Sequence, residues 1–146
     1  MSTIVRPVPA VVAVVLREDE VLLVRRANPP YVGYWGFPGG KIEAGETIEA
    51  AAVRELAEET AVRAEAGRVL TAFDVLDHDG NGRLVRHFVL IAVLCRWISG
   101  EPVAADDALE ARWFRPLDLD EALPCLNLNV VDIIRDAKDA IRRGDL

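Results

Sequence analysis

The sequence predicts an α/β (α+β) fold in which helices sandwich a central mixed β-sheet. Apolar runs rich in β-branched residues lie on both sides of one uninterrupted helical segment, and a second helical pattern ends the chain. Its 146 residues are 51% hydrophobic and 28% charged, which is enough for one buried core. Because no repeat or Ser/Gly-rich linker divides the chain, we expect a single domain over residues 1–146.

The first half of the chain predicts a hairpin, a loop and a helix. Two β-rich runs, Val11 to Leu16 and Val21 to Val24, are separated by four charged residues and indicate the hairpin. The stretch Ala27 to Gly36 holds two prolines and two glycines and is typical of a loop. The helix spans Thr47 to Thr60, with Thr47 as its N-cap and the acidic Glu49 in its first turn. Its core-facing side holds Ala52, Val53, Leu56 and Thr60.

The second half predicts two long strands, a short strand and a helix. Val69 to Leu76 and Leu84 to Leu94 are joined by a turn at residues 78–82 that is rich in Asp, Asn and Gly. Residues 77–82 mimic the start of an EF-hand loop, but Phe88 stands where the bidentate glutamate belongs, so we interpret them as a turn. A short strand over 111–114 places Trp113 and Phe114 in the core. The final helix carries an apolar stripe of Val130, Ile133, Ile134, Ala137 and Ile141.

Composition limits the partners and the compartment. Asp and Glu number 24 against 17 Lys and Arg, a net charge of −7, which argues against binding to polymeric nucleic acid or to an anionic membrane. The apolar run Pro9 to Leu16 is too short to span a membrane and lacks the features of a signal peptide. Cys95 and Cys125 form no disulfide framework or zinc pattern, so we expect structural thiols in a cytoplasmic protein.

Three carboxylates gather on one face of the predicted central helix. At about 100° per residue, Glu55, Glu58 and Glu59 fall within an arc of roughly 100°. The loop before the helix contains Gly39, Gly40 and Gly45, whose backbone can approach an ion closely. Carboxylates and carbonyls are hard oxygen ligands that suit Mg²⁺ or Mn²⁺, and such a site completes its shell with substrate phosphates. Small phosphate esters therefore remain expected partners despite the acidic charge.

The stretch GGKIEAGETIEAAAVRELAEETAV resembles the signature of the Nudix hydrolases, the MutT-like family. In that pattern, G-x5-E-x7-R-E-U-x-E-E-x-G-U, the matching residues are Gly40, Glu46, Arg54, Glu55, Leu56, Glu58, Glu59 and Val62. Ala61 departs from it, because it stands where the family has glycine. If that position needs positive φ, Ala61 costs on the order of 1 kcal/mol.

The resemblance implies roles for these residues. Glu55, Glu58 and Glu59 would bind the divalent ion together with the Gly40 carbonyl. One of these glutamates, with Glu55 and Glu58 as our candidates, or a later acid would activate the attacking water. Asp107 and Glu110 rank ahead of Asp106 for that later acid. Arg54 would pair with Glu46 or Glu58 and hold the loop against the helix.

Other residues are candidates for substrate contact, each with a structural alternative. Arg25 or Arg26 could clamp a phosphate or end a strand in solvent. Trp35, beside Tyr34, could stack on a nucleobase or anchor the loop. Asn127 or Asn129 could recognise a base edge or cap the final helix. His78 and His87 have no partner at nucleophile or metal spacing, so we expect them to be structural.

The resemblance implies a metal-dependent pyrophosphohydrolase acting on a nucleoside diphosphate linked to another group. The loop 27–36, the segment 35–40 and the segment 111–114 look most like the ADP-ribose pyrophosphatase-like branch, which favours ADP-ribose or a nucleotide sugar. One alternative is a nucleoside triphosphate pyrophosphatase that removes modified nucleotides. Another is a non-catalytic sensor of a nucleotide metabolite. A homodimer is possible, although no residue pattern requires one.

Overall fold

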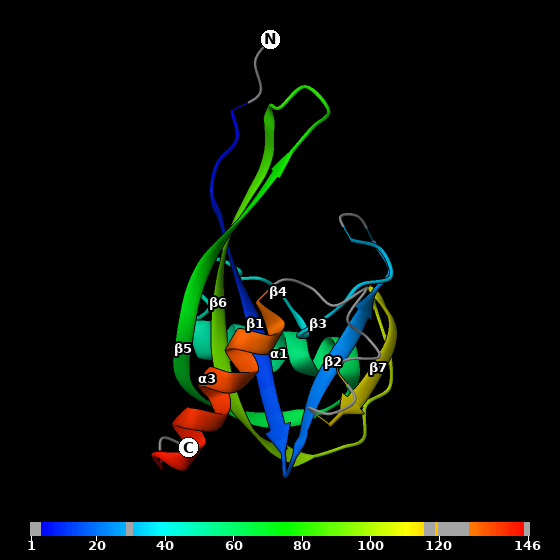
Figure 1. Cartoon of the computed structure of the whole chain (residues 1–146), viewed down its shortest axis with the longest axis vertical. Coiled ribbons are helices and arrows are strands. Elements are labelled where there is room, and N and C mark those ends of the chain that lie inside the picture. Colours follow the sequence, from blue (N-terminus) through cyan, green and yellow to red (C-terminus); the bar gives the residue numbers. More distant parts are fainter. Residues whose placement is uncertain (1–3, 29–30, 116–118, 120–128, 145–146) are drawn as a thin grey trace.

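The computed structural model describes residues 4–28, 31–115, 119 and 129–144 (Figure 1). The strands are β1 (Val8–Arg17), β2 (Glu20–Arg26), β3 (Trp35–Gly36), β4 (Gly39–Lys41), β5 (Arg63–His78), β6 (Leu84–Ser99) and β7 (Ala108–Phe114). The helices are α1 (Ile48–Thr60) and α3 (Val130–Arg142). Among the described helices, none is long and apolar enough to cross a membrane.

The strands form one mixed sheet. Its order is β3-β2-β1-β6-β5, with β4 paired to β1 and β7 paired to β2. β1 and β6 run parallel at its centre, from the pair Val8 and Phe88 to the pair Leu16 and Arg96. The other pairs of neighbours are antiparallel. The predicted hairpin of β1 and β2 is present.

The two helices cover opposite faces of the sheet (Figure 1). On one face, Val11, Ala13 and Val15 of β1 pack against Ala51, Ala52 and Leu56 of α1. On the other face, Val14, Ala92 and Leu94 pack against Ile133, Ala137 and Ala140 of α3. Because both faces of β1 are covered, its sequence is almost continuously apolar rather than alternating. The predicted α/β/α sandwich is therefore confirmed.

Helix α1 begins and ends as its sequence predicts. Thr47 is the N-cap, and its hydroxyl accepts a hydrogen bond from the Ala50 N–H at 3.1 Å. Ala61 is the C-cap, with the left-handed φ of 64° that the motif glycine would accommodate more easily. Ala52, Leu56 and Thr60 are buried as predicted, whereas Val53 is only half-buried.

Other predicted boundaries differ from the structure. β5 begins at Arg63 rather than Val69, β6 continues to Ser99, and the predicted loop at 27–36 ends in the short strand β3. In α3 the buried stripe continues through Ala140, and Ile141 is 39% exposed because it lies one residue further around the helix. Phe114 and Cys95 are buried as predicted. Cys125 and Asn127 lie outside the described residues.

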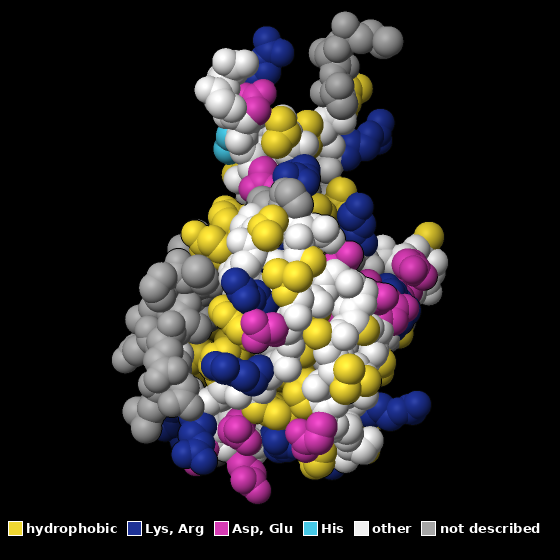
Figure 2. All heavy atoms as spheres, turned by 90° about the vertical axis from the view of Figure 1, so that its right-hand side faces the viewer, with side chains coloured by type: hydrophobic (Ala, Val, Ile, Leu, Met, Phe, Trp, Pro, Cys, Tyr) yellow, Lys and Arg dark blue, Asp and Glu magenta, His cyan; other side chains and the backbone are white. Residues whose placement is uncertain are grey.

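The ends of β5 and β6 form a two-stranded arm that extends beyond the rest of the sheet (Figures 1 and 2). The arm continues past Phe88, the last β6 residue towards the turn that pairs with β1. Leu76, Leu84 and Val85 are exposed on it. Figure 2 shows charged and histidine side chains at its end. Beyond Phe88 the two strands of the arm pair with each other and no longer with β1.

Candidate active site

A single guanidinium group joins the glycine-containing loop to helix α1. Arg54 donates to both carboxylate oxygens of Glu46, through Nε at 2.6 Å and Nη2 at 2.9 Å. Its Nη2 also donates to the Lys41 carbonyl at 3.1 Å. Its Nη1 donates to Glu55 Oε1 at 3.0 Å and to Glu58 Oε2 at 3.2 Å. The bidentate pairing lowers the pKa of Glu46 to about 2.

Two adjacent glycines bring the backbone of β4 against the acidic face of α1. A Cβ atom at Gly40 would lie 2.5 Å from Cδ and Oε1 of Glu55, so a side chain there would displace that carboxylate. A Cβ atom at Gly39 would overlap the Val11 carbonyl oxygen in the neighbouring strand. The Gly39 N–H donates to Glu59 Oε2 at 3.2 Å. The glycines are therefore required by close approach and not by an unusual φ.

Glu59 is the most strongly perturbed acid of the cluster. Burial raises its pKa to about 8, and the neighbouring charges of Glu55 and Asp107 add to the rise. The Gly39 N–H and Arg26 act in the opposite direction. The pKa of Glu55 is also raised, mainly by burial, although Arg54 opposes the change. The fold thus holds carboxylates where their negative charge is incompletely compensated.

A cavity of about 810 Å³ lies beside this cluster. Its lining includes several residues predicted for the site: Gly40, Glu55, Glu59, Arg26, Asp107 and Asn129. Asn129 is also the N-cap residue of α3, but its side chain makes no capping hydrogen bond. The structure therefore brings residues of β2, β4, α1 and the start of α3 to one cavity.

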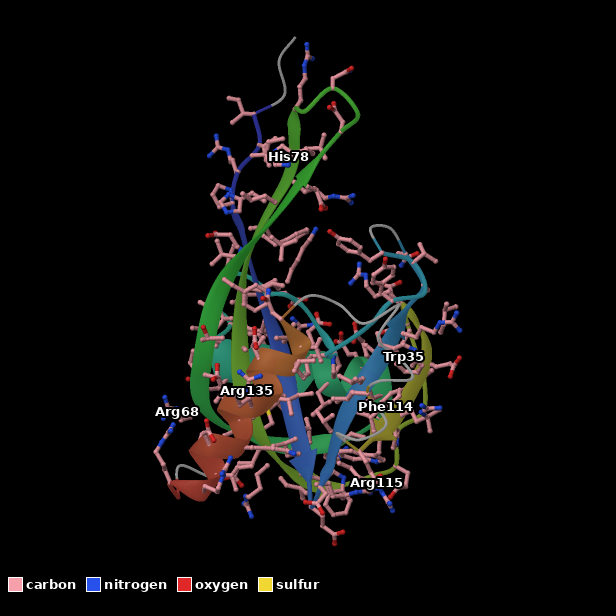
Figure 3. All side chains as sticks on the ribbon, in the orientation of Figure 1. Trp35, Arg68, His78, Phe114, Arg115 and Arg135 are labelled. Atoms are coloured by element: carbon pink, nitrogen blue, oxygen red, sulfur yellow. The ribbon has the colours of Figure 1, made fainter. Side chains whose placement is uncertain are left out.

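Other predicted residues lie outside the lining of this cavity. Arg25 donates to Glu110 Oε1 at 3.1 Å and to the Gly33 carbonyl at 3.1 Å. Trp35 packs edge-on against Phe114, with ring centroids 4.8 Å apart (Figure 3). Glu58, 48% exposed at its side chain, faces Arg54. His78 lies on the arm, away from the carboxylates (Figure 3).

The donors suit a hard divalent cation, although they are not assembled around one point. Among the described residues, no three His, Cys, Asp or Glu side chains are arranged to hold a metal ion. Glu55 and Glu58 both contact Arg54 Nη1 instead. The fit comes from the Gly40 backbone beside the Glu55 carboxylate and from the poorly compensated charge of Glu59. Glu58 would have to turn away from Arg54 to join them.

The apolar wall of the cavity was not among the predicted site residues. Phe73, Val75, Phe88 and Leu90 line it from β5 and β6. These four residues are half-buried and pair across the two strands, Phe73 with Leu90 and Val75 with Phe88. The alternation along each strand predicts one apolar face, but it does not predict that this face borders a cavity.

Comparisons with known proteins point to one family. A family model described as NUDIX domain matches residues 6–136. The chain is 37% identical over 130 residues to a protein named ADP-ribose pyrophosphatase from Methanocaldococcus jannaschii, a match covering 89% of this chain and 72% of that protein. It spans less than two thirds of the length of several other curated relatives.

Two solved structures are similar in fold and sequence. The MutT NUDIX hydrolase from Burkholderia pseudomallei has a TM-score of 0.72 and 28% identity, covering 90% of this chain and 98% of that one. A bifunctional NMN adenylyltransferase/ADP ribose pyrophosphatase from Francisella tularensis, complexed with AMP and a manganese ion, has a TM-score of 0.73 and 27% identity. That match covers 94% of this chain and 42% of the other. The chain therefore belongs to the Nudix family and is a pyrophosphohydrolase.

Proposed function

We propose that the enzyme uses Mg²⁺ or Mn²⁺ to hydrolyse the pyrophosphate bond of a nucleoside diphosphate linked to another group, with ADP-ribose or a nucleotide sugar as substrate. The observation that carries the proposal is the composition of the cavity. Glu55, Glu59 and Arg26 line the same cavity as an apolar wall that includes Phe73 and Phe88. The charged part suits a diphosphate and its metal, and the apolar part suits the organic half of the substrate.

The comparisons support this choice of substrate. The Methanocaldococcus relative is named for ADP-ribose hydrolysis, and the Francisella structure combines that named activity with bound AMP and manganese. AMP is one of the two products expected from ADP-ribose. A small anionic substrate of this kind also agrees with the net charge of −7 once a cation is bound.

In this proposal the residues of the chain bind the metal ion and the substrate, hold the loop in position and accept a proton from the attacking water. A bound divalent ion would neutralise phosphate oxygens and lower the pKa of the attacking water. Glu55, Glu59 and the Gly40 backbone would hold that ion, with Glu58 as a further ligand. Arg54, through Glu46 and the Lys41 carbonyl, keeps the loop beside the helix.

The water oxygen would attack one phosphorus atom while the bond to the bridging oxygen breaks. The leaving phosphate would take the electron pair of that bond, giving AMP and ribose 5-phosphate from ADP-ribose. Asp107 is our choice as the acid that accepts the proton of the water, because it lines the cavity and its charge acts on Glu59. Glu110, paired with Arg25, is the second choice. Arg26 would contact the phosphates.

A second candidate substrate is a nucleoside triphosphate. Asn129 lines the cavity, and its side chain does not cap α3, so we consider its amide as a contact for a base edge. Hydrolysis would then give a nucleoside monophosphate and pyrophosphate. The products distinguish this reaction from the first.

The test is incubation of the purified protein with Mg²⁺ and a panel of ADP-ribose, nucleotide sugars, nucleoside triphosphates and dinucleoside polyphosphates. AMP with ribose 5-phosphate from ADP-ribose is the expected result. Glu59→Gln should lower turnover by at least ~10²-fold. Glu49→Gln, an exposed change on the same helix, is the matched control. Unchanged turnover in the Glu59 variant would refute the metal assignment.

A further inference from the structure

Tyr31 has a strained backbone at the edge of the cavity. Its φ is 66°, in the left-handed region that bulky side chains rarely adopt. Such conformations are energetically costly and concentrate at active sites and ligand-binding positions. Tyr31 lines the cavity, and 42% of its surface is exposed. A large aromatic ring is thus held in solvent contact at an energetic cost.

Hydrogen bonds around Tyr31 hold this strained conformation in place. The Tyr34 N–H donates to the Tyr31 carbonyl at 3.0 Å, and the Gly33 N–H donates to the Arg26 carbonyl at 2.8 Å. Arg25 donates to the Gly33 carbonyl and is itself held by Glu110. The Tyr34 ring supports the Tyr31 ring at a centroid distance of 5.3 Å. Arg25 and Glu110 therefore position the loop that carries Tyr31.

The Tyr31 loop and the arm form different sides of one cavity. Tyr31 of the loop after β2 and Leu76 and Asp77 of the arm line the same cavity. The aromatic residues Phe73 and Phe88 line it from the part of the sheet where the arm begins. Trp35 is turned to Phe114 and does not line the cavity. Tyr31 is thus the exposed aromatic residue that the β2–β3 loop gives to the cavity.

We propose that Tyr31 determines specificity by stacking its ring on the nucleobase of the substrate. This inference rests on the proposed function, because it assigns the base-bearing half of that substrate to the part of the cavity beside the β2–β3 loop. Every nucleobase has a flat π-face, so an exposed ring selects substrates with a base over those without one. The strained backbone presents the ring before the substrate arrives, which reduces the ordering needed on binding.

The test measures binding of AMP and of ribose 5-phosphate by calorimetry in wild type, Tyr31→Phe and Tyr31→Gly. The wild type should prefer AMP. Tyr31→Gly should weaken AMP binding at least about fivefold and leave ribose 5-phosphate within about twofold. Tyr31→Phe keeps the ring and should retain AMP binding. Glycine also tolerates the positive φ, so the Tm of the Gly variant should be at least as high as the Tm of the wild type.

Steady-state kinetics separate this inference from the proposed function. For ADP-ribose, Tyr31→Gly should raise KM more than it lowers kcat. Equal AMP affinity in wild type and Tyr31→Gly, in an enzyme that hydrolyses ADP-ribose, would overturn the stacking role alone. A wild type without preference for AMP over ribose 5-phosphate would also overturn it. Failure to hydrolyse any compound of the panel would overturn the proposed function instead.

Discussion

Replacement of Glu59 by Gln should make the metal-free protein more stable while it removes activity. The pKa of Glu59 is about 8 in the folded protein, above the ordinary value of 4.5. Between these two pH values the folded protein keeps a proton that the unfolded chain has released. The free energy of unfolding must therefore fall as pH rises through this window. Gln resembles the protonated acid and can still accept from the Gly39 N–H.

The size of the effect follows from the width of that window. Each pH unit above the unfolded-state pKa of 4.5 removes about 1.36 kcal/mol of stability from the wild type. At pH 7.5, about three units above that pKa, Glu59→Gln should therefore be more stable than the wild type by about 4 kcal/mol. For a chain of this length that is a rise of roughly 10 °C in Tm. Below about pH 4.5 the two proteins should be equally stable, because Glu59 is then protonated in both the folded and the unfolded state.

The measurement is chemical unfolding followed by circular dichroism from pH 4.5 to 8.5, in a chelating buffer. As pH rises across this range, the free energy of unfolding of the wild type should decline relative to that of Glu59→Gln. The pH profile of Glu49→Gln should match that of the wild type. Saturating Mg²⁺ should stabilise the wild type and have little effect on the Gln variant. Parallel pH profiles for wild type and Glu59→Gln would refute the reasoning, since they would show that Glu59 ionises in the fold without a penalty.

Other substitutions test the loop and the cap. Gly40→Ala should leave the protein folded but lower turnover at least ~10-fold, because its Cβ would displace the Glu55 side-chain carboxylate. Gly39→Ala should instead lower Tm sharply, since its Cβ would overlap the backbone of β1. Normal turnover in folded Gly40→Ala would contradict this division. In the wild type, the free energy of unfolding, followed by circular dichroism, should fall as pH decreases from 4.5 towards 2, and in Glu46→Gln it should fall less. The same decrease in both proteins would count against a stabilising pair of Glu46 with Arg54. Ala61→Gly should add on the order of 1 kcal/mol to the free energy of unfolding, and a lower Tm would contradict the cost assigned to its φ.

Local features of the fold were predictable from the sequence. Helix α1, its Thr47 cap and the pairing of Arg54 with the acids around it depend on residues at most eight positions apart. Helix geometry accounts for the i,i+4 pair of Arg54 with Glu58, whereas the pairing with Glu46 in the preceding loop was expected from the family resemblance. The mixed sheet was also predictable, since apolar β-rich runs have no other place to bury their surface.

Contacts between residues far apart in the sequence were not predictable in the same way. Arg25 meets Glu110 because β2 pairs with β7, and these two residues are 85 positions apart. The start of β5 at Arg63 was missed because its first residues mix exposed and buried positions, and register shifts interrupt its pairing with β6. Phe73 and Phe88 lie in a regularly paired stretch whose alternation predicts an apolar face, but that local pattern does not show that the face borders a cavity.

The parallel pairing of β1 with β6 links folding to function. Parallel neighbours need a crossover connection, and here that connection contains the glycine-containing loop and α1 with its carboxylates. The central strands are about 80 residues apart along the chain, so bringing them together carries a high entropic cost. Glu59 lies on this crossover, and the folded protein buries its carboxylate. Helix α1 is therefore not a removable module, because the segment that connects β1 to β6 also carries the acids that the folded protein desolvates.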